Sequence, residues 1–189
     1  MSHWRSIGVY VPKVSVNLSQ LNLNLDGLPL YVERILNAFH LPASCLVLEI
    51  TETAASELTD DKLNMLRALR NIGVGLSMDD FGTGFSSLAN LAALPVTEIK
   101  IDKSFVQAIA NDNRFSVLVS SIIEIGNKLG LTVVAEGVEN KAQLDSLRSY
   151  NCQIIQGFIY SKAVLADEIS NKFKGGARPL YCNVIIHSC

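Results

Sequence analysis

Short β-rich runs alternate with longer stretches of helical periodicity along most of this chain, and no other feature of the sequence limits its fold as strongly. The six runs predicted as strands cover residues 14–17, 46–49, 74–79, 98–100, 132–136 and 153–156. Repeated βα units imply a parallel sheet, which is either open and doubly wound or closed as a barrel. The 189 residues suffice for one domain, and 49% of them are apolar, which excludes a disordered chain.

Two of the intervening stretches have a clear helical period. Residues 60–70 and 113–129 carry apolar side chains at every third or fourth position. Asp60 and Asn113 are expected to cap their first turns, and Gly73 and Gly130 to end the helices in a left-handed turn. The opening residues, 1–12, are expected to form the last turn of a helix and a loop into the first strand.

Each predicted strand ends on one polar residue. These residues are Asn17, Glu49, Asp79, Lys100, Glu136 and Gln156. A closed barrel gathers the C-terminal ends of all its strands at one mouth, whereas an open sheet places its site at a single switch point. The ring of polar residues favours a TIM-type (βα) barrel, incomplete, with about six of the eight βα units present.

The pair Asp79 and Asp80 runs directly into a glycine loop, in which Gly82 and Gly84 permit a tight turn with backbone N–H groups that face a phosphate. Such a pair is more often an ordinary acidic turn, but it is also the arrangement of a bridging metal ligand. Further hard oxygen ligands are available at Asn17, Glu49 and Glu136. These donors suit Mg²⁺ or Mn²⁺. Two such ions can stabilise both the attacking and the leaving oxygen of an in-line phosphoryl displacement.

Lys100 and Glu139 each have a structural and a functional interpretation. Lys100 lies between Ile99 and Ile101, so it forms either a simple salt bridge or, within a ring of carboxylates, a group that orients a nucleophilic water. Glu139 is either a carboxylate at a helix start or part of the site. Glu136 ends an apolar strand, which makes an ordinary surface role less fitting for it.

Charge and composition exclude several classes of function. The net charge of −2 lacks the basic excess of a protein that binds duplex nucleic acid. No apolar run resembles a signal peptide or spans a bilayer, so we expect a cytoplasmic segment without direct membrane insertion. The three histidines are isolated and the four cysteines lack metal-ligand spacing, which excludes a zinc site, a Ser-His-Asp triad and a disulfide framework.

Six motifs, in order and with compatible spacing, resemble the EAL-type cyclic di-GMP phosphodiesterase domain. They are VNLS at 16–19, LEITET at 48–53, DDFGTGFSSL at 79–88, IKIDKSFV at 99–106, AEGVE at 135–139 and QGF at 156–158. The resemblance covers residues 4–169. It implies that the parent domain uses two divalent metal ions to activate a water and open cyclic di-GMP to linear pGpG.

The resemblance also assigns roles to individual residues. It implies that Asn17, Glu49, Asp79 and Asp80 are metal ligands, with Asp79 as the bridge. It implies that Glu136 serves the second metal or acts as general base. Lys100 matches a lysine near the attacking water, and Gln156 matches a further site residue. Glu52 and Glu139 match carboxylates that hold the glycine loop with Gly82 and Gly84 in its working conformation.

The sequence departs from this family in one important respect, because it contains no Glu-Ala-Leu tripeptide, whose glutamate is a metal ligand in active members. We expect that segment upstream of Met1, so residues 1–174 form a partial EAL-type barrel and residues 175–189 an atypical tail. A smaller departure is Ala163, where the family usually has proline. This chain is then a weak or inactive fragment of the phosphodiesterase; the alternatives are a non-catalytic cyclic di-GMP-binding regulatory domain and a structural interaction piece.

A barrel that lacks two strands has open edges, so we expect a homodimer or larger self-association. Two routes are available. One uses the helix expected at residues 102–110, which resembles a dimerisation segment of related domains, and the other adds the run at residues 184–186 as an edge strand.

Overall fold

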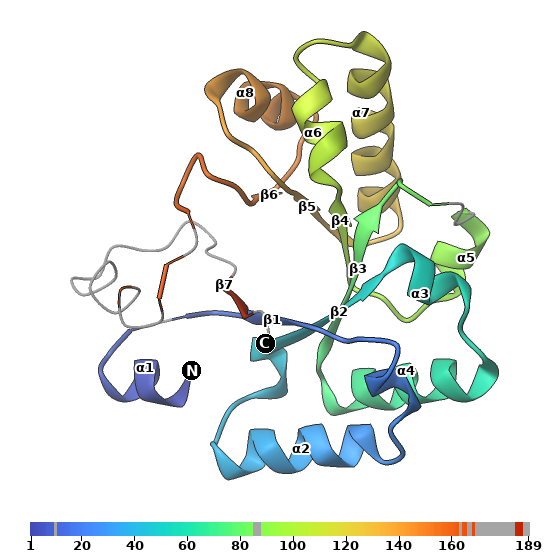
Figure 1. The fold of residues 1–189 in the computed structure, drawn as a ribbon, viewed down its shortest axis with the longest axis vertical. Helices are drawn as coiled ribbons and strands as arrows, with labels where there is room; N and C mark the ends of the chain where they lie inside the picture. Colours follow the sequence, from blue (N-terminus) through green and yellow to red (C-terminus); the bar gives the residue numbers. More distant parts are fainter. Residues whose placement is uncertain (10, 85–87, 163, 166–167, 169–183, 187–189) are drawn as a thin grey trace.

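The computed structural model describes residues 1–9, 11–84, 88–162, 164–165, 168 and 184–186, and Figure 1 shows their course. All strands are parallel and form one sheet in the order β6-β5-β4-β3-β2-β1-β7. Their bounds are β1 Val14–Asn17, β2 Leu46–Thr51, β3 Gly75–Phe81, β4 Glu98–Ile101, β5 Thr132–Ala135, β6 Ile154–Ile155 and β7 Val184–Ile186. From β1 to β6 every strand adds beside its predecessor, which is the winding of a TIM-type barrel. The predicted fold, an incomplete (βα) barrel, is confirmed.

Every helix except α1, which precedes β1, follows a strand, and these helices cover one face of the curled sheet (Figure 1). They are α1 Ser2–Ser6, α2 Leu28–Ala38, α3 Glu52–Ser56, α4 Asp60–Ile72, α5 Leu88–Ala93, α6 Lys103–Ala108, α7 Asn113–Lys128 and α8 Lys141–Ser149. The predicted helices at 60–70 and 113–129 correspond to α4 and α7. Short 3-10 turns, Asn22–Asn24 and Ala43–Cys45, lie before α2 and β2.

The helix N-caps lie one residue earlier than the sequence predicts. Thr59 caps α4 by accepting a hydrogen bond from the backbone N–H of Lys62 at 3.5 Å, and Asp112 caps α7 by accepting one from Arg114 at 2.9 Å. The prediction of Asp60 as N-cap was wrong, and Asn113 is likewise a helical residue rather than a cap. The oxygen that lies before the first turn takes the cap, because only a residue with extended backbone can turn its side chain back onto the exposed N–H groups.

Side chains alternate between the two faces of the strands, except at an irregularity of β3 between Met78 and Phe81. The residues that pack beneath the helices are apolar and belong to one core, among them Ile50, Met78, Ile99, Val133 and Ile155. The opposite, inner face carries residues that the core does not include: Ser15, Val47, Glu49, Ser77, Glu98, Lys100 and Val134. The core thus lies outside the curl of the sheet, and the inner face is largely polar although it is buried.

The segment at 184–186 is the part of the predicted tail that the structure describes. It forms β7 and pairs in parallel with β1, with Val14 opposite Val184 and Val16 opposite Ile186. The predicted edge strand is therefore formed within the chain itself. Ala163, Cys182 and Cys189 lie outside the described residues. In the described part of the chain, no helix combines the length and apolar character needed to cross a membrane.

Candidate metal centre

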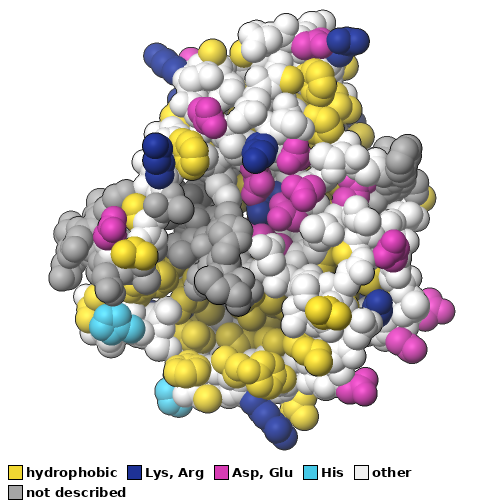
Figure 2. All heavy atoms as spheres, in the orientation of Figure 1, with side chains coloured by type: hydrophobic (Ala, Val, Ile, Leu, Met, Phe, Trp, Pro, Cys, Tyr) yellow, Lys and Arg dark blue, Asp and Glu magenta, His cyan; other side chains and the backbone are white. Residues whose placement is uncertain are grey.

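Lys100 lies at the centre of a cluster of carboxylates on the inner face. Its Nζ lies 2.6 Å from Glu136 Oε1, 3.1 Å from Glu49 Oε1 and 3.2 Å from Asp79 Oδ1. The side chain of Lys100 is only 2% exposed. Figure 2 shows acidic side chains gathered beside a basic one near the middle of this face. The structure therefore brings together four of the six residues that the sequence placed at strand ends.

The protonated form of Lys100 is strongly favoured by this arrangement. Burial by itself lowers the pKa of Lys100, but the attraction of Glu136, Glu49 and Asp79 outweighs burial and holds the pKa above its ordinary value. Lys100 is thus a fixed positive charge. The salt bridge that the sequence suggested for Lys100 is present. Lys100 also lies inside a ring of carboxylates, which is the position that a role in orienting a water requires.

The Asp79–Asp80 pair lies at an irregularity in the sheet. The pairing of β3 with β4 shifts register between Met78 and Phe81, and Asp80 adopts a left-handed conformation with φ of 55°. Such a conformation is costly for a residue with a side chain and is concentrated at functional sites. The bulge aims Asp79 and Asp80 in different directions, so that Asp79 reaches Lys100 on the inner face while Asp80 is exposed.

Asp102, which the sequence reasoning did not select as a site residue, faces Asp80. Burial, the charge of Asp79 and the interaction with Asp102 together raise the pKa of Asp80. Asp102 also caps α6 by accepting a hydrogen bond from Ser104 N at 2.8 Å. Asp102 lies directly after β4, two residues beyond Lys100. It is thus a polar residue at the end of a strand, the same pattern that identified the other site residues in the sequence.

Glu52 holds the glycine loop. Its Oε2 accepts hydrogen bonds from Gly82 N and Gly84 N, both at 2.9 Å, and the residue is 3% exposed. Gly82 is required here, because its φ is 101° and a Cβ would lie 2.3 Å from the ring of Phe105. The carboxylate thus fixes the turn that follows Asp79 and Asp80.

The remaining predicted residues are less tightly held. Glu139 accepts a hydrogen bond from Gln107 Nε2 of α6 at 3.4 Å, so among the described residues it contacts a helix rather than the glycine loop. Its predicted role on the loop stays a prediction. Gln156 is half-buried, and its Oε1 is buried with no hydrogen-bond partner in the described part of the chain. Asn17 is exposed and lies opposite Glu49 in the pairing of β1 with β2.

The donor set suits a hard divalent cation in its chemistry and charge. The five carboxylates of the site are Glu49, Asp79, Asp80, Asp102 and Glu136, and the ion pairs of the described residues give them one basic partner, Lys100. Such an excess of negative charge is what a divalent cation relieves. Within the described residues no three acidic, histidine or cysteine side chains are already arranged around a metal position, and three of the carboxylates instead contact Lys100. The residues fit a hard divalent cation, and the assignment of Asn17, Glu49, Asp79, Asp80 and Glu136 as its ligands stays a prediction.

The described cysteines take no part in this site. Cys45 and Cys152 are buried thiols without a disulfide, and burial raises the pKa of Cys152 to about 11. A thiol with so high a pKa is a poor nucleophile at neutral pH. Both residues are therefore structural.

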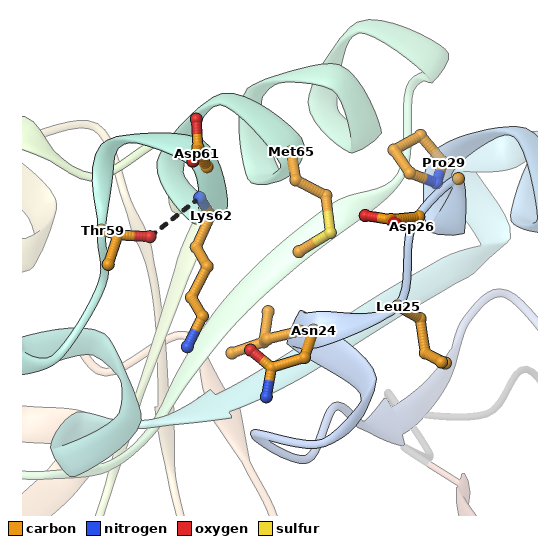
Figure 3. Close-up of a pocket in the computed structure, with 10 residues that line it drawn as sticks. Asn24, Leu25, Asp26, Pro29, Thr59, Asp61, Lys62 and Met65 are labelled. Atoms are coloured by element: carbon orange, nitrogen blue, oxygen red, sulfur yellow. Dashed lines mark hydrogen bonds between the residues drawn. The ribbon is translucent and has the colours of Figure 1, made fainter.

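A separate pocket of about 430 Å³ lies between the loop before α2 and the start of α4. In Figure 3, Lys62 and Met65 of α4 face Asn24 and Asp26 of the loop. None of the site residues lines this pocket, so its volume is not part of the candidate metal centre.

The EAL domain family model matches residues 1–163, and the chain belongs to this family. The oxygen sensor protein DosP of Escherichia coli K12 is 46% identical over 169 residues, which is 89% of this chain. The solved PaMucR phosphodiesterase in complex with c-di-GMP superposes with a TM-score of 0.83 at 40% identity, covering 89% of this chain and 68% of that one. The Klebsiella pneumoniae BlrP1 complex with manganese and cyclic di-GMP at pH 9.0 gives a TM-score of 0.78 at 30% identity, covering 85% and 41%.

The resemblance to the EAL-type domain that the six motifs indicated is thereby confirmed. The chain spans 21% of the length of DosP. Manganese and cyclic di-GMP are what the BlrP1 structure contains, which supports divalent-metal dependence in this family of structures.

Proposed function

We propose that this chain is part of a metal-dependent cyclic di-GMP phosphodiesterase that opens cyclic di-GMP to linear pGpG. The observation that carries the proposal is the position of the buried Lys100 of β4. Its Nζ lies 2.6–3.2 Å from carboxylate oxygens of Glu49 on β2, Asp79 on β3 and Glu136 after β5. A structural barrel gains little from such a cluster, since a buried ionic group is seldom more stabilising than an apolar one of the same volume. The cluster is therefore better explained by chemistry than by stability.

The charges of the site fit a phosphodiester substrate only when cations are present. An anionic substrate would be repelled by the five carboxylates, and Lys100 alone does not compensate them. Mg²⁺ or Mn²⁺ would supply that compensation and would polarise the phosphate for attack. Asn17, Glu49, Asp79, Asp80 and Glu136 are the residues proposed to hold these ions, with Asp79 as the residue shared between them.

The chain's own residues have separate tasks in hydrolysis. Lys100 keeps its proton and orients the attacking water through the carboxylates that it holds. Glu136 accepts a proton from that water as its oxygen bonds to phosphorus and the P–O3′ bond breaks, and it then gives this proton to the departing 3′ oxygen, which leaves as a hydroxyl. Glu52 keeps the loop of Gly82 and Gly84 in place beside the phosphate. Gln156, whose buried amide oxygen has no described partner, is proposed to contact the substrate.

A non-catalytic cyclic di-GMP-binding domain is the second candidate, and one specific observation favours it. The sequence contains no Glu-Ala-Leu tripeptide. A two-metal site that has one carboxylate fewer holds its ions less well. Binding of cyclic di-GMP is thus expected to be better retained in this chain than its hydrolysis.

The purified chain tests both candidates directly. Incubation with cyclic di-GMP and Mn²⁺, followed by chromatography of the nucleotides, measures pGpG, while calorimetry measures binding. We expect binding with weak or absent hydrolysis. A chain that binds neither Mn²⁺ nor cyclic di-GMP contradicts the proposal, and robust pGpG formation shows that another carboxylate fills the place of the absent glutamate.

A further inference from the structure

A second polar layer lies on the inner face, below the cluster around Lys100. Glu98 precedes Lys100 by two residues on β4, so both side chains point to the same side of the sheet. Glu98 is 3% exposed, and Ser77, its neighbour in the pairing of β3 with β4, is fully buried. Glu98 Oε1, Ser15 Oγ and Ser77 Oγ are all buried, and the hydroxyl of Ser77 interacts with the carboxylate of Glu98. Nothing in the proposed chemistry uses this layer.

The partner of Glu98 comes from the far side of the sheet. Lys13 Nζ lies 4.0 Å from Glu98 Oε2, and Lys13 is the residue before β1. Two strands, β2 and β3, separate β1 from β4. On a flat sheet, three strand spacings would hold these backbones about 14 Å apart with their side chains standing parallel. The ion pair can form only because the sheet curls and brings the two side chains toward each other.

The ion pair connects the segments that carry two site residues. Lys13 directly precedes β1, which ends at Asn17, and Glu98 is two residues before Lys100 on β4. Burial disfavours the charged carboxylate of Glu98, so the ion pair is expected to add little to stability. The contact does, however, join β4 to the residue before β1, and these are the strands that present Lys100 and Asn17.

We propose that Lys13 and Glu98 form a clamp across the inner face, which sets the curvature of the sheet and thereby positions Asn17 and Lys100 for metal binding. Both are positioning residues, since neither contacts the proposed ions or substrate. The inference rests on the proposed function for its consequence, but the geometry of the clamp can be tested without any ligand.

The first experiment observes Lys100 and Asn17 directly in the ligand-free full chain. Nitrogen-15 NMR follows the side-chain ammonium of Lys100 and the side-chain amide of Asn17 in the wild type, Lys13→Met and Lys13→Arg. The clamp predicts that both signals shift in Lys13→Met and return toward the wild-type positions in Lys13→Arg, which keeps the charge and the reach. Lys128→Met is the matched control, because Lys128 pairs with exposed Glu124 on α7. Signals that stay in place in Lys13→Met overturn the clamp whether or not the protein binds a metal.

The second experiment measures Mn²⁺ affinity by calorimetry in the same variants and in Glu98→Gln. The clamp predicts weaker binding, about tenfold, in both Lys13→Met and Glu98→Gln, since residues that orient metal ligands commonly contribute that much. A purely electrostatic effect predicts that the two substitutions change Mn²⁺ affinity in opposite directions. Removing the positive charge of Lys13 would strengthen binding, and removing the negative charge of Glu98 would weaken it. Stronger binding in Lys13→Met therefore overturns the clamp. If the wild-type chain binds no Mn²⁺, the proposed function fails, and the NMR experiment alone decides the clamp.

Unfolding measurements distinguish a general loss of stability from a displacement of Asn17 and Lys100. Lys13→Met leaves Glu98 buried without its partner, whereas the double variant Lys13→Met with Glu98→Gln does not. The clamp predicts that the double variant regains unfolding stability but not Mn²⁺ affinity. Affinity that recovers together with stability overturns the positioning role.

Discussion

The ammonium of Lys100 lies 2.6 Å from the carboxylate of Glu136, and this contact joins the middle of β4 to the residue that follows β5. Lys100 extends from this contact to Glu49 and Asp79 on two further strands. A single cation thus binds carboxylates from three strand ends. The carboxylates are held close together, but they are held by Lys100, so a divalent cation has to compete with that lysine for them.

Replacing Lys100 should separate its structural from its chemical contribution. Lys100→Met leaves three carboxylates without their buried cation, and we expect the free energy of unfolding to fall by about 3–5 kcal/mol in a metal-free buffer. Mn²⁺ should restore part of this loss, because the carboxylates no longer have a competing cation. Chemical denaturation with and without Mn²⁺ measures both effects. Lys128→Met, which breaks an exposed pair, should leave the free energy of unfolding nearly unchanged.

Asp79 is expected to contribute more to metal binding than any other single residue. Asp79→Asn removes one negative charge and one oxygen ligand, so the Mn²⁺ dissociation constant measured by calorimetry should rise at least about tenfold. Asp61→Asn is the control, since Asp61 is exposed at the start of α4 beside the separate pocket. Equal Mn²⁺ binding by wild type and Asp79→Asn, or selectivity for Ca²⁺ alone, would falsify the assignment of this site.

The glycine loop should become mobile when Glu52 is removed. Glu52→Ala deletes the acceptor of two charge-assisted hydrogen bonds, so hydrogen exchange at the amides of Gly82 and Gly84 should accelerate about tenfold or more. NMR-detected exchange measures each amide separately. Glu139→Ala is the matched variant. If it leaves both rates unchanged, the role predicted for Glu139 on the loop is contradicted, and unchanged rates in Glu52→Ala contradict the role of Glu52.

The pH dependence of stability should report the buried carboxyl of Glu98. Burial raises its pKa above the ordinary value of 4.5, against the opposing attraction of Lys13. A group with a raised pKa in the folded state keeps its proton after the unfolded chain has released it. Stability is therefore lost as pH rises from about 4.5 through the raised pKa. Thermal unfolding across pH 4 to 8 should show this loss in the wild type and a smaller loss in Glu98→Gln. If the stability of both proteins changes equally with pH, the prediction is contradicted.

Removal of the tail should increase self-association. Within the chain β7 covers the outer edge of β1, so a chain that ends at Lys174 exposes the backbone groups of that edge. Light scattering should give a larger mean mass for the shortened chain than for the full one. A smaller mass for the shortened chain would indicate that the tail joins chains instead. A strictly monomeric state of both at high concentration removes both predicted routes of self-association.

The sequence by itself determined the order and type of the principal elements. Its alternation of β-rich and helical periods predicted β1 and the helices α4 and α7, because hydrophobic periodicity can be recognised in a short stretch of sequence without knowing how the elements pack. The polar residue at each strand end also predicted that Glu49, Asp79 and Lys100 would meet, since the winding of a parallel barrel brings strand ends together. The helix caps were misplaced by one residue, because the capping oxygen is chosen by backbone conformation and not by residue type alone.

Only the tertiary structure decided which groups bind each other. Nothing local in the sequence shows that Lys100 takes three carboxylates, that Asp102 faces Asp80, or that Lys13 reaches Glu98 across two strands. These contacts depend on the curl of the sheet and on the bulge at Asp79 and Asp80, which are properties of the whole sheet and not of any one segment. The chain thus encodes which side chains stand at each strand end, whereas the curvature of the folded sheet decides the distances between them.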